Sequence, residues 1–316
     1  MTADLVTLGE TMVLLASPEI GRLRDMTSLR MSIGGSESNV AICASRLGRS
    51  AAWIGRVGDD EFGQMILATL RREGVDVSAS VTDPSAPTAI MLKERRTAEV
   101  VRVSYYRKDY AGSRLSPEDL DEELIGSAQV LHVTGITLGL SATARAAVYA
   151  AVDTARAGGA LISFDFNYRA ALWTREEAAS EFRAMSREAD LIFAGEDELV
   201  IIKDEASPVE VARMLADGAD RQVVIKRGPM GAICVTRDGL FEQPAFAVRT
   251  IDSVGAGDAF VAGYLTALLG GADVTERLRQ GCAAGAFAVT VIGDWEGAPS
   301  RSDLALLSFD VGTTLR

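Results

Sequence analysis

The stretch TIDSVGAGDAFVAGYL, Thr250 to Leu265, joins a glycine-rich turn to an apolar pattern with helical spacing. The pattern predicts a helix from about Gly257 to Leu269. The first turn of a helix exposes unpaired backbone N–H groups and the positive end of the helix dipole. Glycines also allow a ligand to approach this backbone closely. The stretch therefore predicts an anion-binding turn at Gly255, Ala256 and Gly257.

Asp258 follows this turn directly. A carboxylate beside a bound phosphate can take a proton from a hydroxyl that attacks the phosphorus. An aspartate in the first helical turn can also do no more than complement the helix dipole, which stabilises a helix by roughly 0.3–1 kcal/mol. The stretch alone leaves both interpretations open.

The bulk composition is that of a globular protein. Of the 316 residues 48% are hydrophobic and 24% charged, and the net charge of −12 argues against nucleic-acid or anionic-membrane partners. The three cysteines are far apart and show no CxxC spacing, so neither a disulfide framework nor a zinc site is predicted. The N-terminus resembles no secretory signal, and no apolar run is long enough to cross a membrane. We therefore expect a cytoplasmic protein.

Apolar strand patterns alternate with amphipathic helical patterns along the chain, which predicts an α/β fold with a mostly parallel sheet covered on both faces. Strands are expected at 5–10, 50–58, 130–136, 160–167, 191–195, 222–228 and 231–236, and helices at 38–48, 60–75, 141–158, 175–189, 208–217, 257–269 and 274–291.

Two segments interrupt this alternation. Residues 15–35 show no helical period, and residues 87–107 read as two antiparallel strands joined by a polar turn at Arg95 to Ala98. Together they predict a small accessory sheet that acts as a lid over ligands at the carboxyl ends of the strands. We expect a single α/β domain over residues 1–316, with the lid formed by about 12–34 and 87–110.

Several common site motifs are absent from the sequence. There is no G-x-x-x-x-G-K-[ST] and no G-x-G-x-x-G after the first strand, which argues against a P-loop enzyme and a dinucleotide fold. The single histidine, His132, excludes an HExxH zinc site and lies in an apolar strand pattern, where we expect a core residue.

Four segments carry a family resemblance. GGSESNVAICASRLG (34–48) and GRVGDDEFG (55–63), together with DSVGAGDAFVAGYL (252–265), resemble the two signatures of the ribokinase or PfkB family of sugar kinases. KRGPMG (226–231) looks like the nucleotide-loop element of that family. The similarity covers about residues 4–307, and it implies a ribokinase-like three-layer α/β sandwich with a small β-sheet lid.

The resemblance implies ATP-dependent phosphorylation of a sugar hydroxyl. Asp258 matches the catalytic base of the family, and Gly255, Ala256 and Gly257 match the backbone anion hole that stabilises charge on the phosphoryl group. The positions that match nucleotide-binding residues are Lys226, Gly228, Gly231, Gly255, Gly257 and Ala284.

The resemblance also implies Mg²⁺ and leaves room for a monovalent cation. The family places Mg²⁺ through water with an Asn-x-x-Glu element. Here the corresponding residues read GEDE, so Gly195 replaces the asparagine and Glu198 is kept. We assign Glu198 to the metal through water and leave the role of Gly195 unassigned.

The sugar is indicated by two further comparisons within the family. Ribose and adenosine kinases grip vicinal hydroxyls with an aspartate, and the corresponding residue here is Leu14. The segments 104–120, 131–137, 165–173 and 293–299 instead resemble the branch that phosphorylates 2-keto-3-deoxygluconate. By this resemblance the sugar-acid site consists of Gly35, Tyr105, Arg107, Ile136, Arg169 and Asp294. A carboxylate substrate suits two arginines, because a guanidinium binds a carboxylate in a bidentate arrangement.

Simpler interpretations of these residues stay open. Arg107 and Arg169 could form surface ion pairs, and Asp294 could be a turn former. Tyr105 and Tyr106 lie on opposite faces of a strand, so only one of them should reach the sugar. Met91 stands where family members have a substrate-contacting tyrosine, and it cannot donate that hydrogen bond.

Three other functions compete with a sugar-acid kinase. The first is a fructokinase-like or other neutral-sugar kinase of the same family, and the second is a sugar-acid-binding protein that has lost catalysis. The third, a nicotinamide dehydrogenase, is disfavoured by the missing fingerprint. An exposed edge of the accessory sheet favours a homodimer or higher homo-oligomer through the lid.

Overall fold

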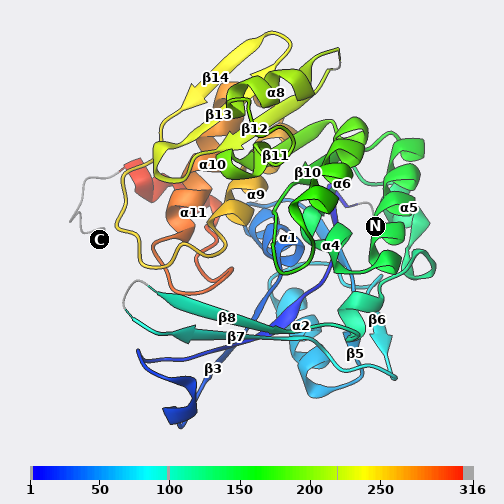
Figure 1. The fold of residues 1–316 in the computed structure, drawn as a ribbon, viewed down its shortest axis with the longest axis vertical. Helices are drawn as coiled ribbons and strands as arrows, with labels where there is room; N and C mark the ends of the chain where they lie inside the picture. Colours follow the sequence, from blue (N-terminus) through cyan, green and yellow to red (C-terminus); the bar gives the residue numbers. More distant parts are fainter. Residues whose placement is uncertain (1–2, 98–99, 219, 309–316) are drawn as a thin grey trace.

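The main sheet has eight strands in the order β14-β13-β12-β11-β10-β9-β1-β4 (Figure 1). The computed structural model describes residues 3–97, 100–218 and 220–308. Strands β4, β1, β9, β10, β11 and β12 pair in parallel, and β13 and β14 continue the sheet antiparallel. The strands are β1 (Leu5–Leu8), β4 (Ala51–Ile54), β9 (Val130–Thr134), β10 (Leu161–Asp165), β11 (Leu191–Gly195), β12 (Gln222–Lys226), β13 (Ala232–Thr236) and β14 (Gly239–Gln243).

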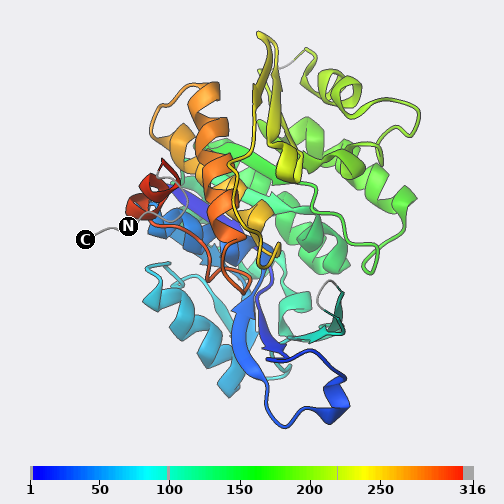
Figure 2. The same cartoon turned by 90° about the vertical axis from the view of Figure 1, so that its left-hand side faces the viewer.

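Helices cover both faces of this sheet, which confirms the predicted layered α/β fold (Figures 1 and 2). One face carries α3 (Glu122–Gly126), α4 (Gly135–Leu140), α5 (Ala142–Gly158), α6 (Arg175–Glu188), α7 (Glu196–Leu199) and α8 (Pro208–Ala216). The other carries α1 (Ser36–Arg46), α2 (Glu61–Arg72), α9 (Ala256–Leu269) and α10 (Val274–Ala288). A short α11 (Arg301–Leu304) follows, and 3-10 turns lie at Leu23–Asp25, Ala111–Arg114, Pro117–Asp119, Gly228–Met230 and Ala305–Ser308. No helix in the described ranges is long and apolar enough to cross a membrane.

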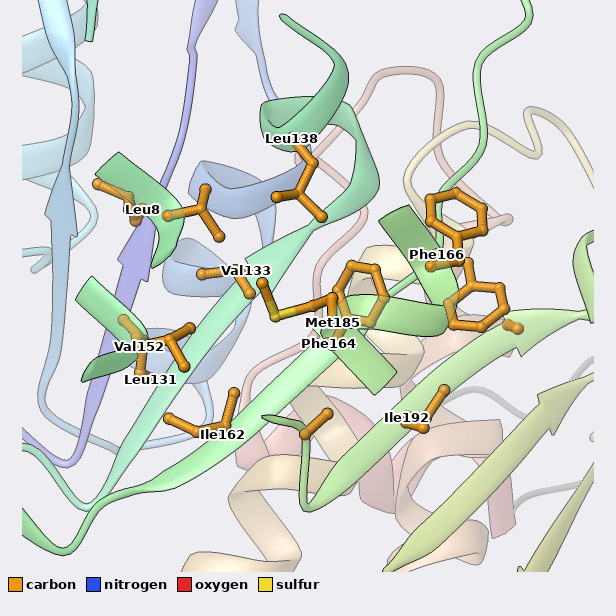
Figure 3. Close-up of a cluster of buried hydrophobic side chains, with 14 of the residues drawn as sticks. Leu8, Leu131, Val133, Leu138, Val152, Ile162, Phe164, Phe166, Met185 and Ile192 are labelled. Carbon is orange, nitrogen blue, oxygen red and sulfur yellow. The ribbon is translucent and has the colours of Figure 1, made fainter. Parts of the chain in front are cut away.

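The two hydrophobic cores follow from the period of the strands. Successive side chains of a strand point to opposite faces, so Leu5 and Val130 belong to the core that includes α1, while Val6 and Leu131 belong to the core beneath α5. Figure 3 shows part of the second core, where side chains from neighbouring strands meet those of the covering helices. His132 lies between Leu131 and Val133 and therefore points to the opposite face of the sheet; it is fully buried, with Nδ1 2.9 Å from Ser163 Oγ, so its predicted core position is confirmed.

A second, four-stranded sheet projects from one side of the main body (Figures 1 and 2). Its order is β3-β2-β7-β8, with β2 (Met12–Ala16), β3 (Arg30–Gly34), β7 (Ile90–Arg95) and β8 (Val101–Tyr106). The expected antiparallel pair is β7 and β8, with Met91 opposite Tyr105. The predicted turn at Arg95 to Ala98 ends at a residue outside the described ranges. The small sheet forms from the two segments that lack a helical period, as the sequence predicts.

Three features of the fold differ from the sequence prediction. Strand β14 and the short helices α3, α4, α7 and α11 were not expected, because four to six residues are too few to show a period. The strand expected at 50–58 divides at Gly55 into β4 and β5 (Arg56–Gly58), and β5 pairs with β6 (Val81–Asp83). A side chain at Gly55 would meet the Trp53 ring at 2.1 Å, so the chain needs glycine where it turns past this ring.

The aromatic cluster around Phe182 of α6 offers a test of the core. Phe182 is fully buried and makes ring contacts with Phe164, Phe166, Tyr168 and Trp173 at centroid distances between 4.5 and 6.5 Å. Phe182→Ala should lower the free energy of unfolding by about 3–5 kcal/mol. The substitution leaves a cavity, and the neighbouring aromatic rings cannot move far enough to fill it.

Urea denaturation followed by circular dichroism measures this loss. Met214→Ala on α8 is the control: Met214 is 48% exposed, and its truncation should change the free energy of unfolding by less than about 1 kcal/mol. Equal losses in the two variants would contradict the packing described here.

Candidate active site

One cavity of about 1570 Å³ lies between the carboxyl ends of the main strands, the start of α9 and the small sheet. Most of the residues that the sequence singles out line it together. They are Gly35, Tyr105, Arg107, Ile136, Arg169, Asp294, Glu198, Lys226, Gly255, Gly257 and Asp258. Four others do not line it: Ala256, Gly228, Gly231 and Ala284.

The start of α9 is held by a close backbone contact. Gly255 is the N-cap residue and has φ +75°, a conformation that favours glycine. A Cβ atom at this position would lie 1.7 Å from the backbone oxygen of Asp294. Glycine is therefore required here twice, by the backbone angle and by the neighbouring chain. Gly255, Gly257 and Asp258 of this first turn line the cavity, and the first N–H groups of a helix have no partner within the helix.

Asp258 lies in this first turn, with each carboxylate oxygen accepting one hydrogen bond. Ser36 Oγ donates to Oδ1 at 2.7 Å, and Asn39 Nδ2 donates to Oδ2 at 2.8 Å. Burial raises the pKa of Asp258 above its ordinary value, and the bonds from Asn39 and Ser36 act in the opposite direction. The group is thus a carboxylate held in one orientation, with its basicity strengthened by burial.

Lys226, at the end of β12, binds a buried partner that the sequence reasoning missed. Its Nζ lies 2.8 Å from Oδ1 and 2.6 Å from Oδ2 of Asp165, which ends β10. Burial alone would lower the pKa of Lys226, but the charges of Asp165 and Glu198 outweigh it, and the net shift is upward. Lys226 is therefore a cation held in one place at the cavity. Its Nζ would lie 3.6 Å from a Cβ atom added to Gly257, so the ammonium group is close to the first turn of α9.

Glu198 occupies the first turn of α7, where two backbone N–H groups hold it. Tyr168 N donates to Oε1 and Gly195 N to Oε2, both at 2.7 Å. Burial raises its pKa, while the charge of Lys226 opposes this. Gly195, the residue in place of the family asparagine, serves as the helix N-cap.

The acidic residues at the cavity suit a metal ion that is bound through water better than one that is coordinated directly by several side chains. Among the described residues no group of three or more His, Cys, Asp or Glu side chains could hold a metal ion. Mg²⁺ commonly keeps several waters and binds to one or two carboxylates together with substrate phosphates. Glu198 and Asp197 both line the cavity and can meet that requirement.

The two arginines have different surroundings. Arg107 is largely buried, and its Nη2 lies 2.7 Å from Oε2 of Glu10, a buried carboxylate that the sequence reasoning also missed. The Arg107 guanidinium also lies 5.5 Å from the centre of the Tyr105 ring. Arg169 is exposed, and its Nη1 donates to the backbone oxygen of Tyr168 at 2.9 Å. Arg169 is the arginine whose charge is available at the cavity.

Asp294 lines the cavity beside the small sheet, where a Cβ atom on Gly34 would lie 2.4 Å from its Oδ2. It is 8% exposed, and burial raises its pKa to about 7. Its neighbour Lys93 on β7 donates to Oδ2 of Asp252 at 2.7 Å, which ties the small sheet to the loop before α9. Met12 and Met91 line the same wall, so the residue in place of the family tyrosine gives this wall an apolar surface.

Of the predicted nucleotide-binding residues that do not line the cavity, Ala284 and Gly231 are closely packed and Gly228 is not. Ala284 is fully buried in α10 and packs against Gly263 of α9, where a Cβ would lie 2.9 Å from it. Gly231 has φ +96°, and a Cβ there would lie 2.0 Å from the backbone oxygen of Gln243. Gly228 has φ +53° and open space around it. Their assignment to the nucleotide stays a prediction.

Comparison with known proteins agrees with this arrangement. The model of the pfkB family of carbohydrate kinases matches residues 2–301. The chain is 39% identical to a 2-dehydro-3-deoxygluconokinase from Thermoproteus tenax, over 94% of this chain and 91% of the relative. It is 35% identical to a 2-dehydro-3-deoxygalactonokinase from Haloferax volcanii, over 93% of each chain. The crystal structure of a putative ribokinase II from E. coli in complex with ATP and Mg²⁺ superposes with a TM-score of 0.90 at 25% identity, covering 96% of this chain and 98% of the other.

The contact between Gly255 and Asp294 can be tested against a glycine with the same backbone angle. Gly271, between α9 and α10, also has φ +75°, but a Cβ atom added there would have nothing within 4 Å. Gly271→Ala should cost about 1–2 kcal/mol of the free energy of unfolding, for the left-handed backbone alone. Gly255→Ala should cost at least about 1–3 kcal/mol more, because the added methyl group displaces the Asp294 backbone.

Chemical denaturation of the two variants and the parent protein makes the comparison. If both substitutions cost the same, the close approach of Asp294 does not constrain the loop.

Proposed function

The chain belongs to the pfkB family of carbohydrate kinases, and we propose that it transfers the γ-phosphoryl group of Mg·ATP to the terminal hydroxyl of 2-keto-3-deoxygluconate or a close aldonic relative. One observation carries this proposal. Asp258 and the amide-rich start of α9 share a single cavity with Arg107 and Arg169. In this proposal Asp258 is the base, the start of α9 binds the phosphoryl group, and the two arginines bind the carboxylate of the substrate.

The arginines support a sugar acid as the acceptor. In this proposal Arg169 binds the substrate carboxylate, because it is exposed at the cavity and no ion pair of its own is recorded in the described part of the chain. Arg107, held by Glu10, presents its remaining N–H groups from the small sheet. Gly35, Tyr105, Ile136 and Asp294 complete the sugar site. The apolar Met12 and Met91 suit a substrate that carries a methylene group in place of a hydroxyl.

The phosphoryl chemistry is assigned to the start of α9. Asp258 accepts the proton of the sugar hydroxyl as its oxygen attacks the γ-phosphorus. The backbone N–H groups of Gly255, Ala256 and Gly257 stabilise the charge that develops on the phosphoryl oxygens, and Lys226 adds a positive charge beside them. We assign Gly228, Gly231 and Ala284 to the nucleotide on the family resemblance alone.

Glu198 and Asp197 would hold Mg²⁺ through water molecules. When bound, the ion neutralises phosphate charge. We keep a monovalent cation as part of the proposal, although no described residue is assigned to it.

The small sheet is proposed to act as a lid and to carry a contact between copies of the chain. Its edge strand β8 exposes Val101 and Tyr106, while Val103 and Tyr105 of the same strand line the cavity. A homodimer through this sheet would cover this edge. The three cysteines are buried and free, which suits the cytoplasm, where we place the reaction.

A substrate panel monitored by ADP formation tests the proposed function. The panel contains 2-keto-3-deoxygluconate, 2-keto-3-deoxygalactonate, gluconate and fructose, each with Mg·ATP. We expect the highest kcat/KM with a 2-keto-3-deoxy acid. Preference for fructose would favour a neutral-sugar kinase, and sugar-acid binding without ADP formation would favour an inactive binding protein.

Asp258→Asn should reduce kcat by at least about 10²–10⁴-fold, because an amide cannot accept the hydroxyl proton. The ATP dissociation constant, measured by calorimetry, should stay within about threefold of the parent value, since the amide has nearly the same shape. Unchanged turnover would remove Asp258 as the base.

Arg169→Ala should raise KM for the sugar acid by roughly 10- to 100-fold, the expected loss for hydrogen bonds to a charged group. KM for ATP should change far less. Arg237→Ala is the control, since Arg237 lies on the surface, is not among the cavity residues and should leave both constants unchanged. An equal rise in both KM values for Arg169→Ala would argue against its place at the sugar acid.

A further inference from the structure

Ser36 links Asp258 to Asn167, a residue in the segment that follows β10. The Ser36 hydroxyl, in the first turn of α1, donates to Asp258 Oδ1 at 2.7 Å. The same oxygen accepts a hydrogen bond from Asn167 Nδ2, also at 2.7 Å. Ser36 is 8% exposed and Asn167 6% exposed, and both residues line the cavity together with Asp258. Neither residue was singled out from the sequence.

The direction of these bonds is determined by the donors. A hydroxyl has one hydrogen to donate, and an amide nitrogen only donates. Because Asn167 fills a lone pair of Ser36 Oγ, the hydroxyl hydrogen is left for Asp258. Asn167 reaches this position from a left-handed backbone, φ 38°, which asparagine tolerates better than most residues. The segment after β10 is thus shaped to orient the serine.

We propose that Asn167 and Ser36 form a positioning relay that keeps Asp258 ionised and turned toward the acceptor hydroxyl. The inference rests on the proposed kinase function and adds two residues to it. With Ser36 on Oδ1 and Asn39 on Oδ2, both oxygens are held by donors, so the carboxylate cannot rotate without losing a bond. The proton of the sugar hydroxyl is received on a lone pair that faces the cavity.

Other charged groups also act on Asp258, and none of them replaces the relay. The charge of Asp165 raises the pKa of Asp258 and the charge of Lys226 lowers it, and these two residues form an ion pair with each other. The remaining titratable groups that interact with Asp258 are Glu37 and Cys43 on α1 and Asp294. Among the side chains of the described residues, Ser36 and Asn39 are the groups that hydrogen-bond it directly.

Ser36→Ala tests the relay, with Ser38→Ala as the matched control. Ser38 is fully buried on the same helix, and its hydroxyl donates to Gly35 O and not to Asp258. Loss of a bond to the ionised form raises the pKa of Asp258, so the acid limb of the kcat/KM profile should move up by about one pH unit in Ser36→Ala. We also expect kcat to fall by about tenfold, with KM for ATP within about twofold. Ser38→Ala should keep the parent profile, and an unmoved acid limb in Ser36→Ala would overturn the relay.

Asn167→Gly tests the bond from Asn167 to Ser36. Glycine is the replacement because it tolerates the left-handed backbone at this position. This variant should move the acid limb in the same direction as Ser36→Ala, and the double variant should lose little more than Ser36→Ala alone. Independent, additive losses would show that Asn167 does not act through Ser36.

A stability measurement separates the relay from the proposed function. The bond from Ser36 stabilises ionised Asp258, so its contribution is present at about pH 8 and is lost as the pH falls through the raised pKa of Asp258. The melting temperature of Ser36→Ala should therefore fall further below the parent at about pH 8 than at about pH 4, while the deficit of Ser38→Ala stays the same. This result would support the relay even if every sugar in the panel failed, and equal deficits for Ser36→Ala at both pH values would contradict it.

Discussion

The parallel pairing of the central strands is the constraint on which the candidate active site depends. Because β1, β9, β10, β11 and β12 run in one direction, the residues that follow them emerge at the same edge of the sheet. Glu10, Asp165, Glu198 and Lys226 come from different parts of the chain and meet there. Helix α9 points its first turn at the same edge and adds backbone N–H groups and Asp258.

Charge compensation is the second feature of this edge. A buried charge is costly unless it is paired and hydrogen-bonded. Lys226 pairs with Asp165, Lys93 with Asp252 and Arg107 with Glu10, all with little exposure to solvent. These pairs hold cations in place before any ligand arrives, and the exposed Arg169 supplies charge that is not already paired within them. A chain with net charge −12 can in this way present a local site for anions.

Much of the architecture was predictable because local patterns carry it. The long helices and the buried parallel strands have clear periods, and the glycine turn before α9 has a composition that few other structures require. The family resemblance placed Arg107, Arg169, Lys226 and Asp294, which all line the cavity. Short elements such as β14 and α4 were missed, because a few residues do not establish a period. Ala284, which the resemblance matches to a nucleotide-binding residue, is buried in α10 against α9, and that assignment stays a prediction.

The sequence by itself determined the class of fold, the glycine turn before α9 and the position of the acid that follows it, because these depend on residues close together in the chain. Only the tertiary structure decided the partners of the charged and polar groups. Glu10 and Arg107 are far apart in sequence, as are Asp165 and Lys226, and Ser36, Asn167 and Asp258 come from three separate elements. Nothing local in the chain distinguishes these carboxylates and hydroxyls from exposed ones. Their roles arise when folding removes water from them and leaves another side chain as the remaining partner.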